Sequence, residues 1–367
     1  MDMISEEQVM KALSQVIDPD LGKDIVTLKM VKDVKTTEKT VSFTVVLTTP
    51  ACPLKELIRN ACINAIHHLI DKDVEVSVRM SSRVTSNRKD NKQLLSQVRN
   101  IIAVASGKGG VGKSTVAANL ALSLAKEGAS VGLMDADIYG PSVPIMFGVR
   151  GERPMMTKVN GKGMIVPLER YGIKLMSIGL LVDERQAIVW RGPMASSALK
   201  QFVTEVQWGE LDYLVIDLPP GTGDIHLTLV QTIPVTGVVV VTTPQQVALA
   251  DAKKGIAMFS TGAIKVPVLG LVENMAYFTP ADNAEKRYYI FGKDGGKKLA
   301  EEFEIPLLGQ IPLVEGICEG GDLGIPVMMG DDEITMAAFS EFAQNAARQI
   351  AIRNANMAPT QVVEMAR

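Results

Sequence analysis

Residues 107–115 read Gly107-Lys108-Gly109-Gly110-Val111-Gly112-Lys113-Ser114-Thr115. An apolar, β-prone run at residues 101–105 precedes this stretch, and apolar residues at three- and four-residue spacing follow it. A strand, a glycine-rich turn and a helix in that order form the context of a phosphate-binding P-loop. The glycines let backbone N–H groups turn toward phosphates, and the N-terminus of the next helix adds its dipole. The stretch therefore predicts a nucleotide-binding P-loop rather than a plain strand–helix turn.

Side chains of this loop have distinct expected roles. The whole stretch from Gly107 to Thr115 is expected to surround the phosphates of ATP. We expect Lys113 to contact the β- and γ-phosphates and the Ser114 hydroxyl to ligate Mg²⁺. The ordinary P-loop motif does not require Lys108. We predict that Lys108 projects outward to a nucleotide on a partner subunit, as an arginine finger acts in trans.

Two aspartates follow predicted strands and extend the site. Asp137 comes directly after the strand at residues 131–135, and Asp217 ends the strand at residues 213–217. Ligands of open α/β sheets collect at the carboxyl ends of the strands. We predict that Asp137 orients or activates the attacking water near Mg²⁺, and that Asp217 holds Mg²⁺ directly or through water. For either aspartate alone, a turn or helix cap would explain the residue equally well, and the P-loop favours function.

Composition limits the class of protein. The chain has 367 residues, 47% hydrophobic and 22% charged, with a net charge of −3. These values are typical of a globular protein of two or three domains. The absence of excess positive charge and an aromatic content of 5% argue against nucleic-acid partners. Three cysteines and the absence of a signal-peptide pattern favour a reducing, cytoplasmic setting, and no apolar run is long enough to cross a membrane.

The chain divides into four predicted segments. Residues 1–83 are expected to form a small α+β domain, in which Ser5 begins the first helix and the Asp18-Pro19-Asp20 turn stops it. Residues 84–99 are polar and aperiodic, which is typical of a linker. Residues 100–352 alternate strands with helices, so we predict an α/β P-loop NTPase domain whose mostly parallel sheet is flanked by helices. Residues 353–367 form a tail that is not a basic amphipathic helix, so it does not indicate membrane binding.

The cysteines Cys52 and Cys62 receive different interpretations. Pro53 suits the first position of a helix, which would place Cys52 at the N-cap, where the helix dipole favours a thiolate. Cys52 is thus predicted to be a reactive or metal-binding thiol, with a buried, inert cysteine as the alternative. Cys62 lies beside the apolar face of the same predicted helix and is expected in the core.

Several motifs together resemble a known family. The segments Asp18-Pro19-Asp20-Leu21-Gly22 and Thr48-Thr49-Pro50-Ala51-Cys52-Pro53 resemble the small domain of iron–sulfur assembly factors. The P-loop with Lys108 belongs to the same pattern. Three further segments complete it: Asp135-Ala136-Asp137-Ile138-Tyr139-Gly140-Pro141-Ser142, Trp190-Arg191-Gly192-Pro193-Met194 and Asp217-Leu218-Pro219-Pro220-Gly221-Thr222-Gly223-Asp224. Nearly the whole chain resembles the bacterial Mrp/ApbC iron–sulfur cluster carrier ATPases, which share a deviant Walker A motif with MinD and ParA.

The resemblance implies a cytoplasmic homodimer that hydrolyses ATP with Mg²⁺ and delivers iron–sulfur clusters, [4Fe-4S] in type, to apo client proteins alongside assembly factors. It also implies that Asn274 and Pro312 line the adenine pocket, where the Asn274 amide offers a donor and an acceptor to the base. The net charge of −3 and the character of the tail predict no nucleic-acid or membrane partner.

One departure from the family concerns the cluster ligands. Many of these carriers have a Cys-x-x-Cys pair after the Glu-Asn-Met segment, and here Thr279 and Asp282 occupy the two positions. Iron–sulfur clusters prefer thiolate ligands. Cys52 and Cys318 are the remaining candidates, and Cys318 lies in a glycine-rich stretch where an incidental loop cysteine is the alternative. The leading hypothesis is an ATP-dependent cluster carrier; a MinD/ParA-like positioning switch and a cluster-free assembly scaffold are the alternatives.

Overall fold

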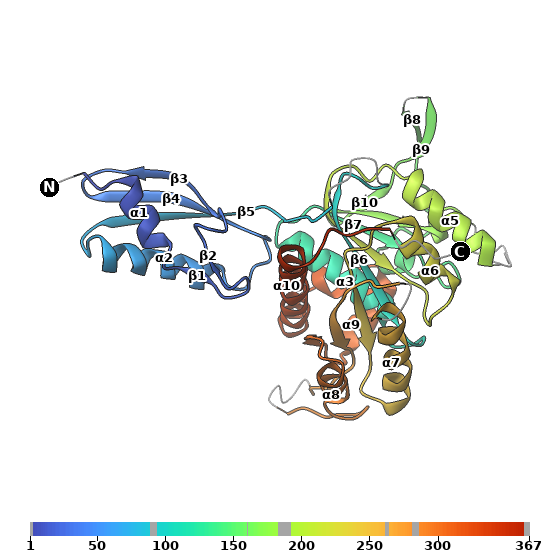
Figure 1. Cartoon of the computed structure of the whole chain (residues 1–367). Coiled ribbons are helices and arrows are strands. Elements are labelled where there is room, and N and C mark those ends of the chain that lie inside the picture. The colour runs from blue at the N-terminus through green and yellow to red at the C-terminus, as the bar shows by residue number, and fades with distance from the viewer. Residues whose placement is uncertain are drawn as a thin grey trace. The chain divides into compact units, whose positions relative to one another are not determined.

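The structure is a computed structural model that describes residues 3–88, 94–159, 161–182, 192–260, 264–280 and 286–362 (Figure 1). The chain splits into two compact units. The first comprises Met1–Thr85 with Ala351–Met357, and the second comprises Ser86–Ile350 with Ala358–Arg367.

The first unit is an α+β fold around a three-stranded sheet. Strand β3 (Val31–Thr36) pairs antiparallel with β4 (Thr40–Leu47), and β4 pairs in parallel with β5 (Glu75–Ser82). Helix α2 (Lys55–Leu69) connects the two parallel strands, and α1 (Glu6–Leu13) packs against it. Apolar side chains of both helices and of the sheet form one core. The predicted α+β domain is confirmed.

The first helix begins where the sequence predicts but ends earlier. Ser5 caps α1 in a capping box, because its Oγ accepts a hydrogen bond from the backbone N–H of Gln8 and the Gln8 side chain accepts one from Ser5. The helix ends at Leu13 rather than at Asp18. Ile17–Asp18 instead form β1, which pairs with β2 (Lys23–Asp24). This pairing keeps the segment extended, so the predicted helix stop at the Asp-Pro turn was wrong.

The second unit is built on an eight-stranded sheet with the order β10-β11-β7-β12-β6-β13-β14-β15. Only β10 pairs antiparallel with its neighbour. The strands are β6 (Val98–Ser106), β7 (Val131–Asp135), β10 (Leu168–Arg170), β11 (Ile173–Ser177), β12 (Leu211–Asp217), β13 (Gly237–Thr242), β14 (Val268–Glu273) and β15 (Leu307–Gln310). The central strands are buried at nearly every residue, as expected for a parallel sheet covered on both faces.

Helices flank this sheet, and those that precede β15 lie in the connections between its strands. The helices are α3 (Lys113–Lys126), α4 (Val143–Met146), α5 (Gly192–Thr204), α6 (Asp224–Thr232), α7 (Gln246–Ser260), α8 (Gly295–Glu302), α9 (Glu315–Leu323) and α10 (Glu333–Asn356), with 3-10 turns at Ile178–Leu180 and Val327–Met329. A separate hairpin consists of β8 (Met156–Val159) and β9 (Lys162–Ile165). The predicted α/β fold with a mostly parallel sheet is confirmed. Within the described ranges, no helix combines the length and apolar character needed to span a membrane.

Three adjacent strands end together and position the site. Strand β12 lies between β7 and β6, and Asp217 at its end is in register with Asp135 of β7 and Val104 of β6. Strand β6 ends at Ser106, immediately before the glycine-rich loop. The carboxyl ends of these strands therefore bring the loop and both aspartate-bearing segments to one edge of the sheet.

Candidate active site

The glycine-rich loop takes a conformation that depends on its glycines. Gly110 and Gly112 have φ values of 81° and 80°, in the left-handed region that favours glycine. A Cβ atom on Gly107 would lie 2.2 Å from the backbone carbonyl of Asp251 in α7. A Cβ atom on Gly112 would lie 2.2 Å from Nδ2 of Asn274. The loop is thus both turned and closely packed, and α3 begins directly after it at Lys113.

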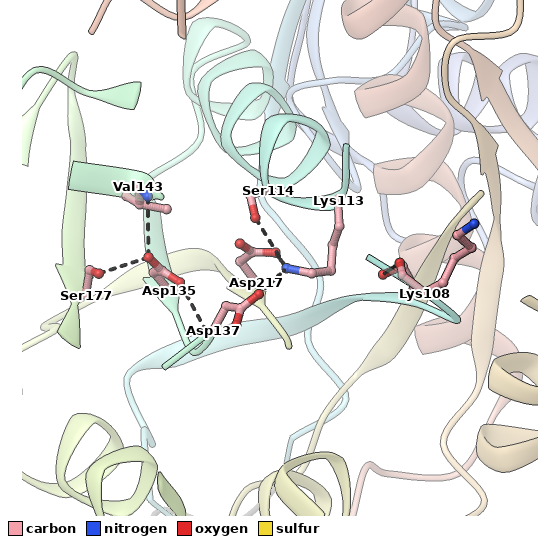
Figure 2. A network of polar contacts seen from close by, with 9 residues as sticks. Lys108, Lys113, Ser114, Asp135, Asp137, Val143, Ser177 and Asp217 are labelled. Atoms are coloured by element: carbon pink, nitrogen blue, oxygen red, sulfur yellow. Dashed lines mark hydrogen bonds and ion pairs between the residues drawn. The ribbon is translucent and has the colours of Figure 1, made fainter. Parts of the chain in front are cut away.

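The ammonium group of Lys113 lies at the centre of a buried polar cluster (Figure 2). The side chain of Lys113 is 6% exposed and forms an ion pair with Oδ1 of Asp217. Its Nζ also lies 3.6 Å from Oδ2 of Asp137 and donates to Oγ of Ser114 at 3.3 Å. Four residues predicted from three separate motifs therefore meet at one point.

The carboxylate of Asp217 has the character of a metal ligand. Asp217 is fully buried, and burial raises its pKa, while the neighbouring Lys113 charge opposes this rise. Its Oδ2 is buried without a hydrogen-bond partner among the described residues. A buried oxygen that lacks a donor is costly unless a cation or water satisfies it. With the nearby Ser114 hydroxyl it makes an oxygen donor set that fits Mg²⁺, which binds through one or two protein oxygens plus phosphates and water.

Asp135 supports the loop that carries Asp137. Oδ2 of Asp135 accepts hydrogen bonds from Oγ of Ser177 at 2.9 Å and from the backbone N–H of Val143 at 3.4 Å (Figure 2). Its Oδ1 accepts a hydrogen bond from the backbone N–H of Asp137 at 3.1 Å. Burial and the nearby charge of Asp217 raise the pKa of Asp135 to about 8. Asp135 therefore fixes the backbone, while Asp137 faces Lys113. No sequence motif indicated that Ser177 would support Asp135.

Lys108 is arranged differently from Lys113. Figure 2 shows its side chain pointing away from Lys113 and from the carboxylates. Its backbone carbonyl accepts a hydrogen bond from Oγ of Ser106, which fixes the start of the loop. This orientation is compatible with the predicted role in trans, which stays a prediction.

A cavity of about 400 Å³ opens from the glycine-rich loop. Gly112 and Thr115 line one end, and Asn274, Pro312 and Cys318 line other parts of its wall. Nδ2 of Asn274 donates to the backbone carbonyl of Val111 at 2.8 Å, so this amide also braces the loop. The volume is in the range of small-molecule sites. The predicted contact of Asn274 and Pro312 with adenine stays a prediction.

The three cysteines lie in different environments. The predicted N-cap position of Cys52 was wrong, because α2 begins at Lys55 and its N-cap is Leu54. Cys52 is instead partly buried against the core of the first unit. Cys62 is fully buried in that core, as predicted, and burial raises the pKa of its thiol to about 12. Cys318 is exposed and lies on helix α9, not in a loop, which the glycines of that segment obscured.

Parts of the predicted site lie outside the described residues. Trp190 and Arg191 do so, as does Asp282, one of the two positions where a Cys-x-x-Cys pair was expected. Thr279, the other position, lies within the described range. Among the described residues, no group of three or more His, Cys, Asp or Glu side chains could hold a metal ion.

The fold and the site define a P-loop NTPase. A family model described as NUBPL iron-transfer P-loop NTPase matches residues 97–350, and one described as iron–sulfur cluster assembly protein matches residues 6–78. The chain belongs to this family of iron–sulfur cluster carriers and assembly factors.

Named relatives agree over most of the chain. The iron–sulfur cluster carrier protein of Synechocystis is 46% identical over 353 residues, covering 95% of this chain and 99% of that protein. The iron–sulfur cluster carrier protein of Deinococcus radiodurans is 44% identical, and the match covers 97% of this chain and 99% of that protein. A solved nucleotide-binding protein from Archaeoglobus fulgidus, in complex with ADP, is 40% identical, with a TM-score of 0.56, over 66% of this chain and 93% of that one.

Proposed function

We propose that this protein hydrolyses ATP as a cytoplasmic homodimer and couples hydrolysis to delivery of iron–sulfur clusters to apo client proteins. The observation that carries the ATPase assignment is the convergence of Lys113, Ser114, Asp137 and Asp217 beside the glycine-rich loop. Membership of the carrier family supports the cluster cargo.

Each residue of the cluster has a role in the proposed reaction. Backbone N–H groups of the loop bind the phosphates, and Lys113 neutralises the β- and γ-phosphate charge. Ser114 and Asp217 would hold Mg²⁺, which supplies charge stabilisation to the transferring phosphoryl group when bound. Asp137, whose carboxylate faces the Lys113 ammonium, orients the attacking water. The ion pairs of Lys113 with Asp137 and Asp217 hold its ammonium group beside the glycine-rich loop.

In this proposal the partner subunit supplies a second positive charge to each nucleotide, the ammonium group of Lys108. Lys108 points away from its own site and would reach the nucleotide of the partner subunit. ATP binding would then close the two subunits, and hydrolysis would reopen them. Steady hydrolysis is expected to be slow, because such switches wait for a conformational step or a client.

Cys52 and Cys318 are the proposed cluster ligands, since Cys62 is buried in the core. A dimer contributes two copies of each candidate thiol, and thiolates are the ligands that iron–sulfur clusters use. The assembly-type domain at the N-terminus would recruit clients or assembly factors.

The replacement of Asp137 by alanine tests the ATPase site. We expect Asp137→Ala to lower kcat by about 10²-fold or more with little change in ATP binding, because the orientation of water is lost. Phosphate release and nucleotide titration measure the two quantities. Hydrolysis at the parental rate would contradict the role given to Asp137.

A cluster-free assembly scaffold is the second candidate. Thr279 at one expected thiolate position favours it, because a hydroxyl is a poor iron–sulfur ligand. Transfer assays with a reconstituted protein and an apo-ferredoxin distinguish the two functions, because only a carrier would activate the acceptor without added iron and sulfide.

A further inference from the structure

A second cavity, of about 430 Å³, lies on the Asp137 side of the site. Asp137 and Tyr139, from the loop after β7, line one part of it. Pro219 and Gly223, from the loop after β12, and His226 of α6 line another. The cavity thus lies between the two loops that follow the aspartate-bearing strands. His226 was not among the residues that the sequence motifs indicated.

The imidazole of His226 has a defined hydrogen-bonding state. The residue is 1% exposed, and its Nδ1 lies 3.3 Å from the backbone carbonyl oxygen of Gly223. A carbonyl oxygen can only accept, so the hydrogen bond assigns the proton to Nδ1. Burial, together with the charge of Lys113, lowers the pKa of His226 and favours the neutral ring, while the backbone carbonyls of Gly223 and Pro219 oppose this shift. In the tautomer with the proton on Nδ1, Nε2 carries the lone pair.

Nε2 of His226 lacks a donor in its buried position. It has no hydrogen-bond partner among the described residues. Buried acceptors in proteins are nearly always satisfied by protein or by ordered water. Because His226 lines the cavity, a donor inside the cavity is the natural partner. The Asp137 carboxylate, which lines the same cavity, is also an acceptor.

We propose that His226 is a further residue of the hydrolytic site and that its Nε2 accepts a hydrogen bond from a water molecule that Asp137 also binds. A water molecule has two O–H groups, so two acceptors fix both of them and leave the oxygen lone pairs directed elsewhere. His226 takes no proton in this arrangement; it orients the water. The inference rests on the proposed ATP hydrolysis and adds a residue to it.

Two conservative substitutions separate this role from a structural one. In His226→Asn the side-chain amide can replace Nδ1 and keep the contact with Gly223, but nothing replaces Nε2. In His226→Gln the longer amide can replace Nε2, and the contact with Gly223 is lost. If the water contact matters, His226→Gln retains more activity than His226→Asn. If only the Gly223 contact matters, the order is reversed.

We expect His226→Asn to lower kcat for ATP by about tenfold and to leave KM within about twofold, since one hydrogen bond to the reacting water is lost. His226→Gln is expected to stay within about threefold of the wild-type kcat. Thermal unfolding of each variant controls for folding. The reverse order of the two variants, or a parental rate for His226→Asn, would overturn the proposal. Absence of hydrolysis in the wild type would instead contradict the proposed ATPase function.

Nitrogen NMR of the imidazoles gives a readout that is independent of turnover. The chain has three histidines, and the other two, His67 and His68, lie on α2 and serve as internal references. We expect His226 to show a proton on Nδ1, and its Nε2 signal to shift when Mg²⁺ and a non-hydrolysable ATP analogue are added. A proton on Nε2, or an Nε2 signal that the analogue leaves unchanged, would overturn the inference.

Discussion

At the scale of single residues, the site balances buried charges. Lys113 is enclosed by Asp217 and Asp137, so its positive charge lowers the cost of burying the two carboxylates, which repel each other. Asp135, two residues before Asp137, accepts hydrogen bonds from backbone N–H groups and from a hydroxyl in the described part of the chain. Neighbouring carboxylates of one short motif therefore have separate tasks, one supporting the loop and one facing the reaction.

Cys318 offers a direct test of the nucleotide cavity. The thiol is exposed and lines the cavity that begins at Gly112, so we expect bound nucleotide to cover it. With Mg²⁺ and ATP analogue at about tenfold above the dissociation constant, labelling by a thiol reagent should slow about tenfold. Mass spectrometry identifies the labelled cysteine, and Cys318→Ser is the control. Labelling of Cys318 at the same rate with and without nucleotide would contradict this placement of the nucleotide.

At the scale of elements, the glycine-rich loop is held by its neighbours as well as by its own turns. Helix α7 approaches Gly107 so closely that no side chain fits, and Asn274, after β14, packs against Gly112. Glu273 ends β14 and accepts hydrogen bonds from the backbone N–H of Gly296 and from the Gln310 side chain, which ties β14 to α8 and β15. The loop geometry thus depends on elements far away in the sequence.

Replacement of Gly107 by alanine tests this packing. The added Cβ would lie 2.2 Å from the Asp251 backbone, which cannot move without displacing α7. We expect Gly107→Ala to lower the free energy of unfolding by about 1–3 kcal/mol, the usual cost of overpacking. Gly109→Ala is the matched control, because its Cβ would meet nothing nearer than Pro220 Cγ at 3.9 Å. Denaturant unfolding without nucleotide measures the free energy of unfolding of both variants. An equal loss of stability in Gly107→Ala and Gly109→Ala would contradict the packing argument.

Elements also show how far the sequence could predict the structure. Long apolar runs predicted the strands β7 and β14 with the bounds that the structure has, because buried parallel strands need apolar side chains on both faces. The hairpin β8–β9 and the edge strand β10 were missed, since they are short and largely exposed. Pro53 suggested that the second helix starts two residues before its actual start at Lys55. No pattern showed that the first helix would end at Leu13 and that Ile17–Asp18 would form the strand β1.

The same limits hold for the site. The local spacing of the P-loop indicated Lys113 and Ser114, and the position after predicted strands indicated Asp137 and Asp217. His226, Ser177 and the cavity wall at Cys318 depend on strand order and on helix packing, which no local spacing encodes. Interactions between distant segments were therefore the part that sequence reasoning could not predict.

At the scale of the whole molecule, the chain combines two units with different matches. The N-terminal segment matches an iron–sulfur cluster assembly protein model, and the larger segment matches an iron-transfer P-loop NTPase model. In the proposed function the ATPase unit provides the switch. The chain lacks the expected Cys-x-x-Cys pair, so the central claim is that a cluster is bound through Cys52 or Cys318 thiolates of a dimer instead.

Anaerobic reconstitution with iron and sulfide tests this claim most directly, by visible absorption and by iron and sulfide content. We predict a stoichiometric cluster on the wild-type dimer that is lost in Cys52→Ala or in Cys318→Ala, because thiolates are the ligands that iron–sulfur clusters require. Wild-type protein that hydrolyses ATP but binds no cluster would contradict the carrier function and favour the scaffold.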